Sequence, residues 1–296
     1  MLHYYHKQFQ GLPSFAKHKG SKTRKSSCHS TIIFCAIFQK NLQKNFSPSQ
    51  KFSLTLHRKK QCVNIMKYTE FEDLISSARM RKYITACGND TRKAMKLYRL
   101  NLKLSQEMFT VISCFEVILR NKIDKVMQQY FGNDWLRDSV ANNGIFFSDN
   151  RVEQTRKIIT KAYNELVREN NYSHTKLLSQ MEFGVWKYMF NNVQYRLSGR
   201  HLLSVFPNKP RSTPQMRIDN SKIFLELDYI NNIRNRIAHH KPICFGNPVC
   251  ISDVYTKVNY NRIKTLFSRM GVDSKRLLYG MDNVESKCLE IMNFLT

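Results

Sequence analysis

The sequence lacks any Cys-x-x-Cys pair, although it contains eight cysteines. Structural zinc sites are usually built from such short Cys or His pairs, because four ligands must converge on one tetrahedron. Their absence argues against a zinc-finger module. Several cysteines, Cys114 among them, lie within apolar runs, which predicts reduced and buried thiols in a cytosolic protein.

The sequence also lacks an apolar run long enough to cross a membrane. The longest run near the start covers residues 32–38, far below the roughly 20 residues that a spanning helix needs. It lies too far along the chain, and without a clear cleavage site, for a signal peptide. We therefore expect no transmembrane segment.

Residues 1–65 contain no acidic residue, but they contain 12 Lys or Arg. A leader of this kind can imitate an organelle transit peptide. A plainer interpretation is a basic, disordered extension from a misassigned start codon, because Met66 begins a sequence that looks like a natural start. We therefore predict two parts: residues 1–65 as this extension, and residues 66–296 as the folded domain.

The chain is strongly basic, with 48 Lys or Arg against 22 Asp or Glu and a formal net charge of +26. Residues 66–296 alone carry 36 basic and 22 acidic residues, so the folded part is basic without its leader. This balance favours a polyanionic partner such as nucleic acid or an anionic membrane surface. A basic protein without such a partner is the plainer alternative.

The pattern after Met66 is helical, with no strand alternation and no internal repeat, and it predicts an all-α fold. We expect one helix over residues 69–86, followed by a stretch of about 40 residues that is capped by Asp90 or Thr91 and broken near Asn101–Ser105. Three prolines, at 207, 210 and 214, mark a loop. Further helices are predicted at residues 148–170, 175–191, 197–205, 216–240, 252–270 and 282–295.

Two charged residues interrupt apolar stripes. Glu116 lies among apolar residues at helical spacing, and Arg234 interrupts a similar apolar stripe in a later predicted helix. A buried carboxylate must be paired or become neutral, so Glu116 and Arg234 are candidates to share one interior cleft. The simpler alternative is an ion pair between Glu116 and Arg120, one turn later, that only orders the helix.

The segment Arg234–His240 combines two histidines with two arginines and an asparagine. Arg234 lies five positions before His239, or about 140° around an ideal helix, so one regular helix does not point both at the same place. Either the last turn is distorted or two copies of the helix pool their side chains. The simpler interpretation is a helix end whose cations suit the helix dipole.

From Met66 onward the chain resembles the Abi (abortive-infection) family, whose members look like HEPN-type ribonucleases. Order and spacing of the matching pieces make the resemblance specific, and Lys241 departs from it where an acid is often found. The pieces are Tyr83–Gly88, Leu97–Asn101, Phe115–Asn121, Gly132–Leu136, Met181–Trp186, Val205–Pro207 and Ile233–Ile243.

The resemblance implies a HEPN-like helical bundle with additional helices and a metal-independent endoribonuclease assembled at a homodimer interface in the bacterial cytoplasm. RNA cleavage by its own 2′-hydroxyl needs proton transfer, which a histidine supplies near neutral pH, and positive charge on the phosphate. We assign proton transfer to His239, phosphate binding to Arg234, and orientation of His239 or a phosphate contact to Asn235. His240 is the alternate proton carrier.

Glu116, Arg120 and Asn121 are expected to support this site, and no metal or cofactor is expected. RNA is the expected partner, with a regulatory RNA or antitoxin as a further one. The main alternative is a non-catalytic RNA- or protein-binding helical module with the same residues. A membrane-acting suicide protein is a third reading, and the lack of a spanning segment counts against it.

Overall fold

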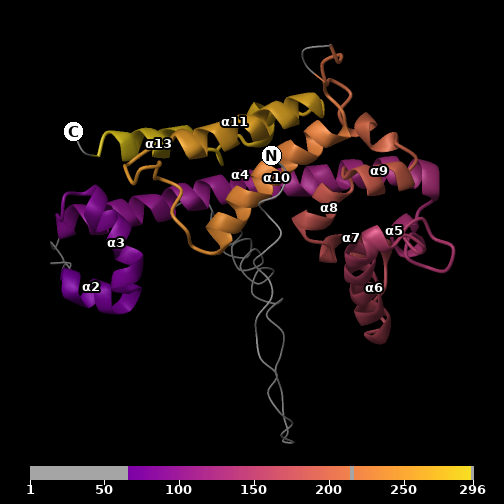
Figure 1. Ribbon diagram of the computed structural model, residues 1–296, viewed down its shortest axis with the longest axis horizontal. Coiled ribbons are helices and arrows are strands. Elements are labelled where there is room, and N and C mark those ends of the chain that lie inside the picture. The colour runs from indigo at the N-terminus through magenta and orange to yellow at the C-terminus, as the bar shows by residue number, and fades with distance from the viewer. Residues whose placement is uncertain (1–65, 214–216, 295–296) are drawn as a thin grey trace, which may run out of the picture. The chain divides into compact units, whose positions relative to one another are not determined.

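The computed structural model describes residues 66–213 and 217–294, and these residues fold entirely as helices and loops (Figure 1). The prediction for residues 1–65 falls outside the described residues. Apart from one isolated antiparallel bridge between Phe245 and Ile251, the described residues contain no β-structure. The expected all-α fold is confirmed. The helices are α2 (Tyr68–Ile75), α3 (Ser77–Ala86), α4 (Thr91–Phe131), α5 (Trp135–Asp138), η1 (Asn150–Val152), α6 (Glu153–Arg168), α7 (His174–Gln180), α8 (Phe183–Tyr188), α9 (Asn192–Leu197), η2 (His201–Val205), α10 (Asn220–Ala238), α11 (Val254–Arg269), α12 (Ser274–Leu277) and α13 (Val284–Met292).

Helix α4 is the longest helix among the described residues, and it contacts α3, α8, α10, α11 and α13. Its start is capped as expected, because the Asp90 carboxylate accepts a hydrogen bond from the backbone N–H of Lys93 at 2.9 Å. The ring of Phe115, fully buried on α4, lies 6.3 Å from Phe183 of α8 and 5.4 Å from Phe267 of α11. The core therefore includes the place where α4, α8 and α11 meet.

Helix α4 is continuous over 41 residues, so the break predicted near Asn101–Ser105 is wrong. Asn101 is buried, and its side-chain oxygen accepts a hydrogen bond from the backbone N–H of Ile243 at 2.9 Å. The polar residue that looked like a helix breaker instead pairs a buried donor from a distant segment.

Two other helices predicted as single are each divided. The one expected over residues 69–86 breaks at Ser76, which has a φ of 83° and whose hydroxyl accepts from the Arg79 N–H at 3.4 Å. The one expected over residues 175–191 becomes α7 and α8, because Met181 and Glu182 are extended. The short helix expected at 197–205 is replaced by α9 and η2.

Helix α10 begins after Asp219, whose carboxylate accepts from the Lys222 N–H at 3.0 Å, and not near residue 216. Its buried face (Ile223, Leu227, Ile230 and Ile233) packs against α4, α8 and α11. Figure 1 shows α11 and α13 along α4, with α10 crossing it. This packing places the C-terminal end of α10, which carries the predicted motif, beside α3 and α4.

The five cysteines among the described residues are all free. Cys87, Cys244 and Cys288 are buried and Cys114 is half-buried, whereas Cys250 is exposed. Burial raises the pKa of the Cys244 thiol to about 12, so this thiol is a packing group rather than a nucleophile. The expectation of buried thiols holds for three of the five. None of the helices in residues 66–213 and 217–294 is long and apolar enough to cross a membrane.

Candidate active site at the end of helix α10

The last turn of α10 ends in a Schellman motif. His240 has a left-handed φ of 54°, and its N–H donates to the Ile237 carbonyl at 2.9 Å. The Lys241 N–H donates to the Arg236 carbonyl at 2.8 Å, which completes the two bonds of this motif. His239 is the C-cap, with φ −88° and ψ 14°. The helix therefore does not continue regularly through the two histidines.

Two arginines hold this turn in place. Arg79 of α3 donates from Nη1 to the His240 carbonyl at 2.8 Å. Arg236 donates from Nε to the Pro242 carbonyl at 2.6 Å, and its guanidinium lies 5.6 Å from the centre of the Tyr255 ring. Arg236 thus has a structural role, because its contacts join the end of α10 to the chain that follows.

The backbone of Ile243, just after the motif, is held on both sides by side chains. Its N–H donates to Asn101 of α4, and its carbonyl accepts from the Thr256 hydroxyl of α11 at 2.8 Å. All of these groups are buried, so the bonds form in a region of low dielectric where an unpaired group is costly. The histidine turn is therefore anchored to α3, α4 and α11.

Arg234 is half-buried, and its Nε is buried without a hydrogen-bond partner among the described residues. Its Nη1 makes one long hydrogen bond, 3.4 Å, to the side-chain oxygen of Asn235. His239 and His240, in contrast, are exposed. The guanidinium thus keeps donors that protein groups do not use, which is the condition for binding an oxyanion.

Glu116 is the acidic neighbour of Arg234. Burial raises the pKa of Glu116, and the carboxylate of Glu182 adds to that rise. The charges of Arg234 and Arg120 and the backbone N–H of Phe183 oppose it. Three helices, α4, α8 and α10, therefore bring their charged or polar groups to one half-buried place.

The structure brings Glu116 and Arg234 together, but it places the two histidines on the exposed turn. The hydrogen bond of Arg120 goes to its neighbour Asn121, at 3.4 Å, rather than to Glu116. No hydrogen bond between described residues joins Arg234 to His239. Within one chain, the expected site is thus two adjacent features, a half-buried arginine and an exposed pair of histidines.

Sequence reasoning missed the residues that position this turn, Arg79, Asn101 and Thr256. Asn101 had a signal, since it is a polar residue within an apolar stretch at helical spacing, but it was interpreted as a break. Arg79 and Thr256 lie in ordinary amphipathic helices and carry no local signal. Among the described residues, no group of three or more His, Cys, Asp or Glu side chains is placed to hold a metal ion.

The family model described as Abi-like protein matches residues 61–244, which include α3, α4 and the whole of α10 with both histidines. No curated protein and no solved structure matches the chain.

Proposed function

The chain belongs to the Abi-like protein family, and we propose that it is a bacterial abortive-infection protein that cleaves RNA at the end of α10 without a metal ion. Family membership indicates abortive-infection defence. The assignment of ribonuclease chemistry rests on the residues around Arg234, and it is the part that experiment must test.

The observation that carries the proposal is the environment of Arg234. Its guanidinium is half-buried, its Nε has no hydrogen-bond partner in the part of the chain that the structure describes, and burial raises the pKa of the nearby Glu116. Arg234 can therefore bind two phosphate oxygens and stabilise the charge that develops during cleavage.

Proton transfer falls to the exposed histidines. An imidazole exchanges protons near neutral pH, and it can take the proton of the 2′-hydroxyl or protonate the leaving 5′-oxygen. In the balanced step, the 2′-oxygen bonds to phosphorus, the bond to the 5′-oxygen breaks, and a 2′,3′-cyclic phosphate and a 5′-hydroxyl remain. We assign the main role to His239 and the alternate role to His240.

Asn235 and the three residues of α4 complete the proposed site. Asn235 contacts Arg234 directly, so it orients the guanidinium or adds a phosphate contact. Glu116 sets the charge around Arg234, while Arg120 and Asn121 support it from the same helix.

We further propose that the active form is a homodimer in which both α10 ends meet. The reason is the separation within one chain: Arg234 lies against α4, whereas His239 is exposed and available to a second copy. Mixing Arg234→Ala chains with His239→Ala chains should restore part of the activity if each site draws on both protomers. A monomer across micromolar concentrations in light scattering contradicts the dimer.

The test of catalysis is incubation with RNA in EDTA, followed by mapping of the cut ends. His239→Ala should lower the rate by about 10²-fold or more, the usual scale for a general acid or base. Arg234→Ala should also lower the rate heavily, and Arg234→Lys should only partly restore it, because lysine lacks the bidentate fork. Lys241→Ala is the matched control, since it changes an exposed cation on the same turn.

Two outcomes overturn this mechanism. Cleavage of a substrate with a single 2′-deoxy sugar at the cut site shows that the 2′-hydroxyl is not the nucleophile. Complete dependence on Mg²⁺ shows that the chemistry belongs to a metal ion. If every variant still binds RNA and none cleaves it, the remaining interpretation is that the protein is a non-catalytic binding module.

A further inference from the structure

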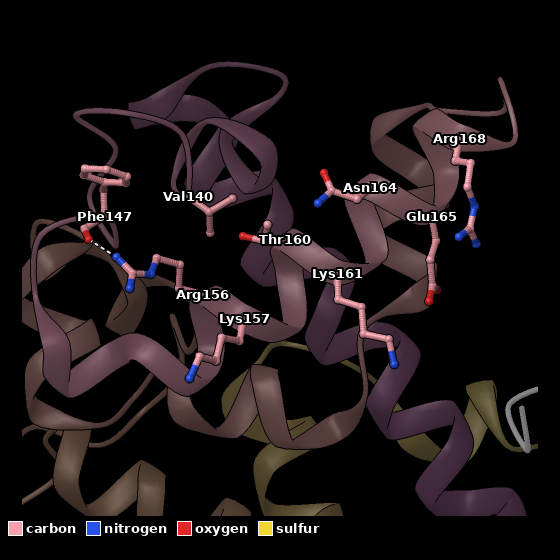
Figure 2. A pocket seen from close by; sticks show the side chains of 9 residues that line it. All are labelled: Val140, Phe147, Arg156, Lys157, Thr160, Lys161, Asn164, Glu165 and Arg168. Carbon is pink, nitrogen blue, oxygen red and sulfur yellow. Dashed lines mark hydrogen bonds between the residues drawn. The ribbon is translucent and has the colours of Figure 1, made fainter. Parts of the chain in front are cut away.

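A second basic feature lies on α6, and it forms one wall of a groove of about 720 Å³ (Figure 2). The other wall is the loop between α5 and η1, which contributes Val140 and Phe147. Helix α6 supplies the remaining lining residues: Arg156, Lys157, Thr160, Lys161, Asn164, Glu165 and Arg168.

The groove is positively charged because basic side chains recur along one face of α6. Lys157, Lys161, Asn164 and Arg168 follow one another at intervals of four, three and four residues, so they fall within about 60° of one another around the helix. The opposite face, with Ile159 and Leu166, is buried, which turns the basic stripe outward. At a rise of about 1.5 Å per residue, the stripe is about 16 Å long.

These cations are available to a ligand. Lys161 and Arg168 are exposed and form no hydrogen bond or ion pair with the described residues. Lys157 pairs with Glu153 at 2.7 Å, but both side chains are about half exposed or more, so the pair is weak and easily exchanged. Among the described residues that line the groove, Glu165 is the one acid.

The loop adds an aromatic surface beside the cations. Phe147 is 39% exposed, and the guanidinium of Arg156 lies 5.8 Å from the centre of its ring. Arg156 also donates a hydrogen bond to the Phe147 carbonyl, so the loop is tied to α6. Figure 2 shows both side chains at the same end of the groove.

We propose that this groove binds a single-stranded nucleic acid, with backbone phosphates along Lys157, Lys161 and Arg168 and a base stacked near Phe147. The row of cations on α6 and the exposed ring of Phe147 together favour this ligand, because proteins that bind single-stranded nucleic acids combine a positive groove with aromatic side chains on which bases stack. A duplex offers no free base to Phe147, and an acidic peptide makes no use of an aromatic platform. The inference concerns binding alone and does not require that the chain cleave the strand.

The test is fluorescence anisotropy with labelled 12-nucleotide RNA, DNA of the same sequence and a duplex, in a His239→Ala background that prevents cleavage by the proposed mechanism. The groove variant is Lys161→Gln with Arg168→Gln. Its matched control is Lys275→Gln with Arg276→Gln, which removes two exposed cations from α12. Melting curves verify that each variant is folded.

The groove variant should bind single strands at least about 10-fold more weakly at 0.1 M salt. It should also lower the slope of log K against log salt by about 1.4, because each lost phosphate contact contributes about 0.7 on single strands. Phe147→Ala should weaken binding by about 5- to 150-fold, the range of one stacked base. The α12 control should change neither quantity.

Equal losses in the groove variant and the α12 control overturn the inference, because they reflect net charge alone. A Phe147→Ala variant that binds like its parent, or tighter binding to the duplex, also overturns it. Cleavage that depends on His239 together with unaltered binding in the groove variant refutes the groove but leaves the proposed function standing. If the groove variant loses binding and no variant cleaves RNA, the groove is supported and the proposed ribonuclease function is refuted.

Discussion

Replacing His240 with glycine should stabilise the protein, even though it removes a histidine of the motif. His240 has a left-handed φ of 54°, a conformation that costs an L-residue about 1–2 kcal/mol. Glycine avoids this cost but loses about 0.5–1 kcal/mol more chain entropy on folding. The His240 side chain is exposed, so its removal takes away little packing. The net effect is a gain of about 0.5–1 kcal/mol.

The measurement is thermal or urea unfolding of wild type, His240→Gly and His240→Ala. In a unit that spans Asn64–Thr296, about 1 kcal/mol corresponds to a shift in Tm of about 2–4 °C. His240→Ala is the matched control, because it removes the same imidazole but keeps a Cβ in the left-handed conformation. Alanine should be no more stable than histidine, and glycine should exceed alanine.

A glycine variant that is no more stable than the alanine variant refutes the left-handed turn and the Schellman motif with it. The same pair also separates structure from chemistry in the cleavage assay. A loss of activity shared by both variants belongs to the imidazole, whereas a loss confined to alanine belongs to the backbone.

Three further predictions concern Glu116, Asp124 and residues 1–65. Burial raises the pKa of Glu116, so the stability that the Glu116 carboxyl contributes is complete below its ordinary pKa and is lost as pH rises through the raised pKa. Glu116→Gln should therefore flatten the plot of unfolding free energy against pH between these two pKa values. Clear destabilisation by Glu116→Gln at neutral pH would show that attraction to Arg234 and Arg120 dominates. The Asp124 carboxylate accepts a hydrogen bond from Trp135 Nε1 at 2.7 Å and lies 2.7 Å from His174 Nε2. Asp124→Ala should therefore lower the free energy of unfolding by about 2–4 kcal/mol, measured by urea unfolding with tryptophan fluorescence, and Asp124→Asn should lower it less. Equal stability of Asp124→Ala and wild type would contradict these contacts. Residues 66–296 expressed alone should melt cooperatively, and an insoluble or non-cooperative product would show that residues 1–65 belong to the fold.

The sequence was a good guide to helix content and to the ends of helices with local caps. Asp90 begins α4 through its own side chain, and Pro242 lies just beyond the end of α10. It was a poor guide where tertiary contacts overrule local preference. Asn101 is a mild helix breaker in isolation, yet in the folded chain it lies within an unbroken 41-residue helix.

By itself, the sequence determined that the protein is helical and basic and that it carries a motif with two arginines and two histidines, because spacing and charge are local properties. Only the tertiary structure decided the surroundings of that motif. It placed Glu116 near Arg234, and it joined Asn101 to Ile243 across 142 positions of sequence. Such contacts depend on how α4 and α10 pack, and packing is set by the shapes of many buried side chains at once, so no short pattern records it.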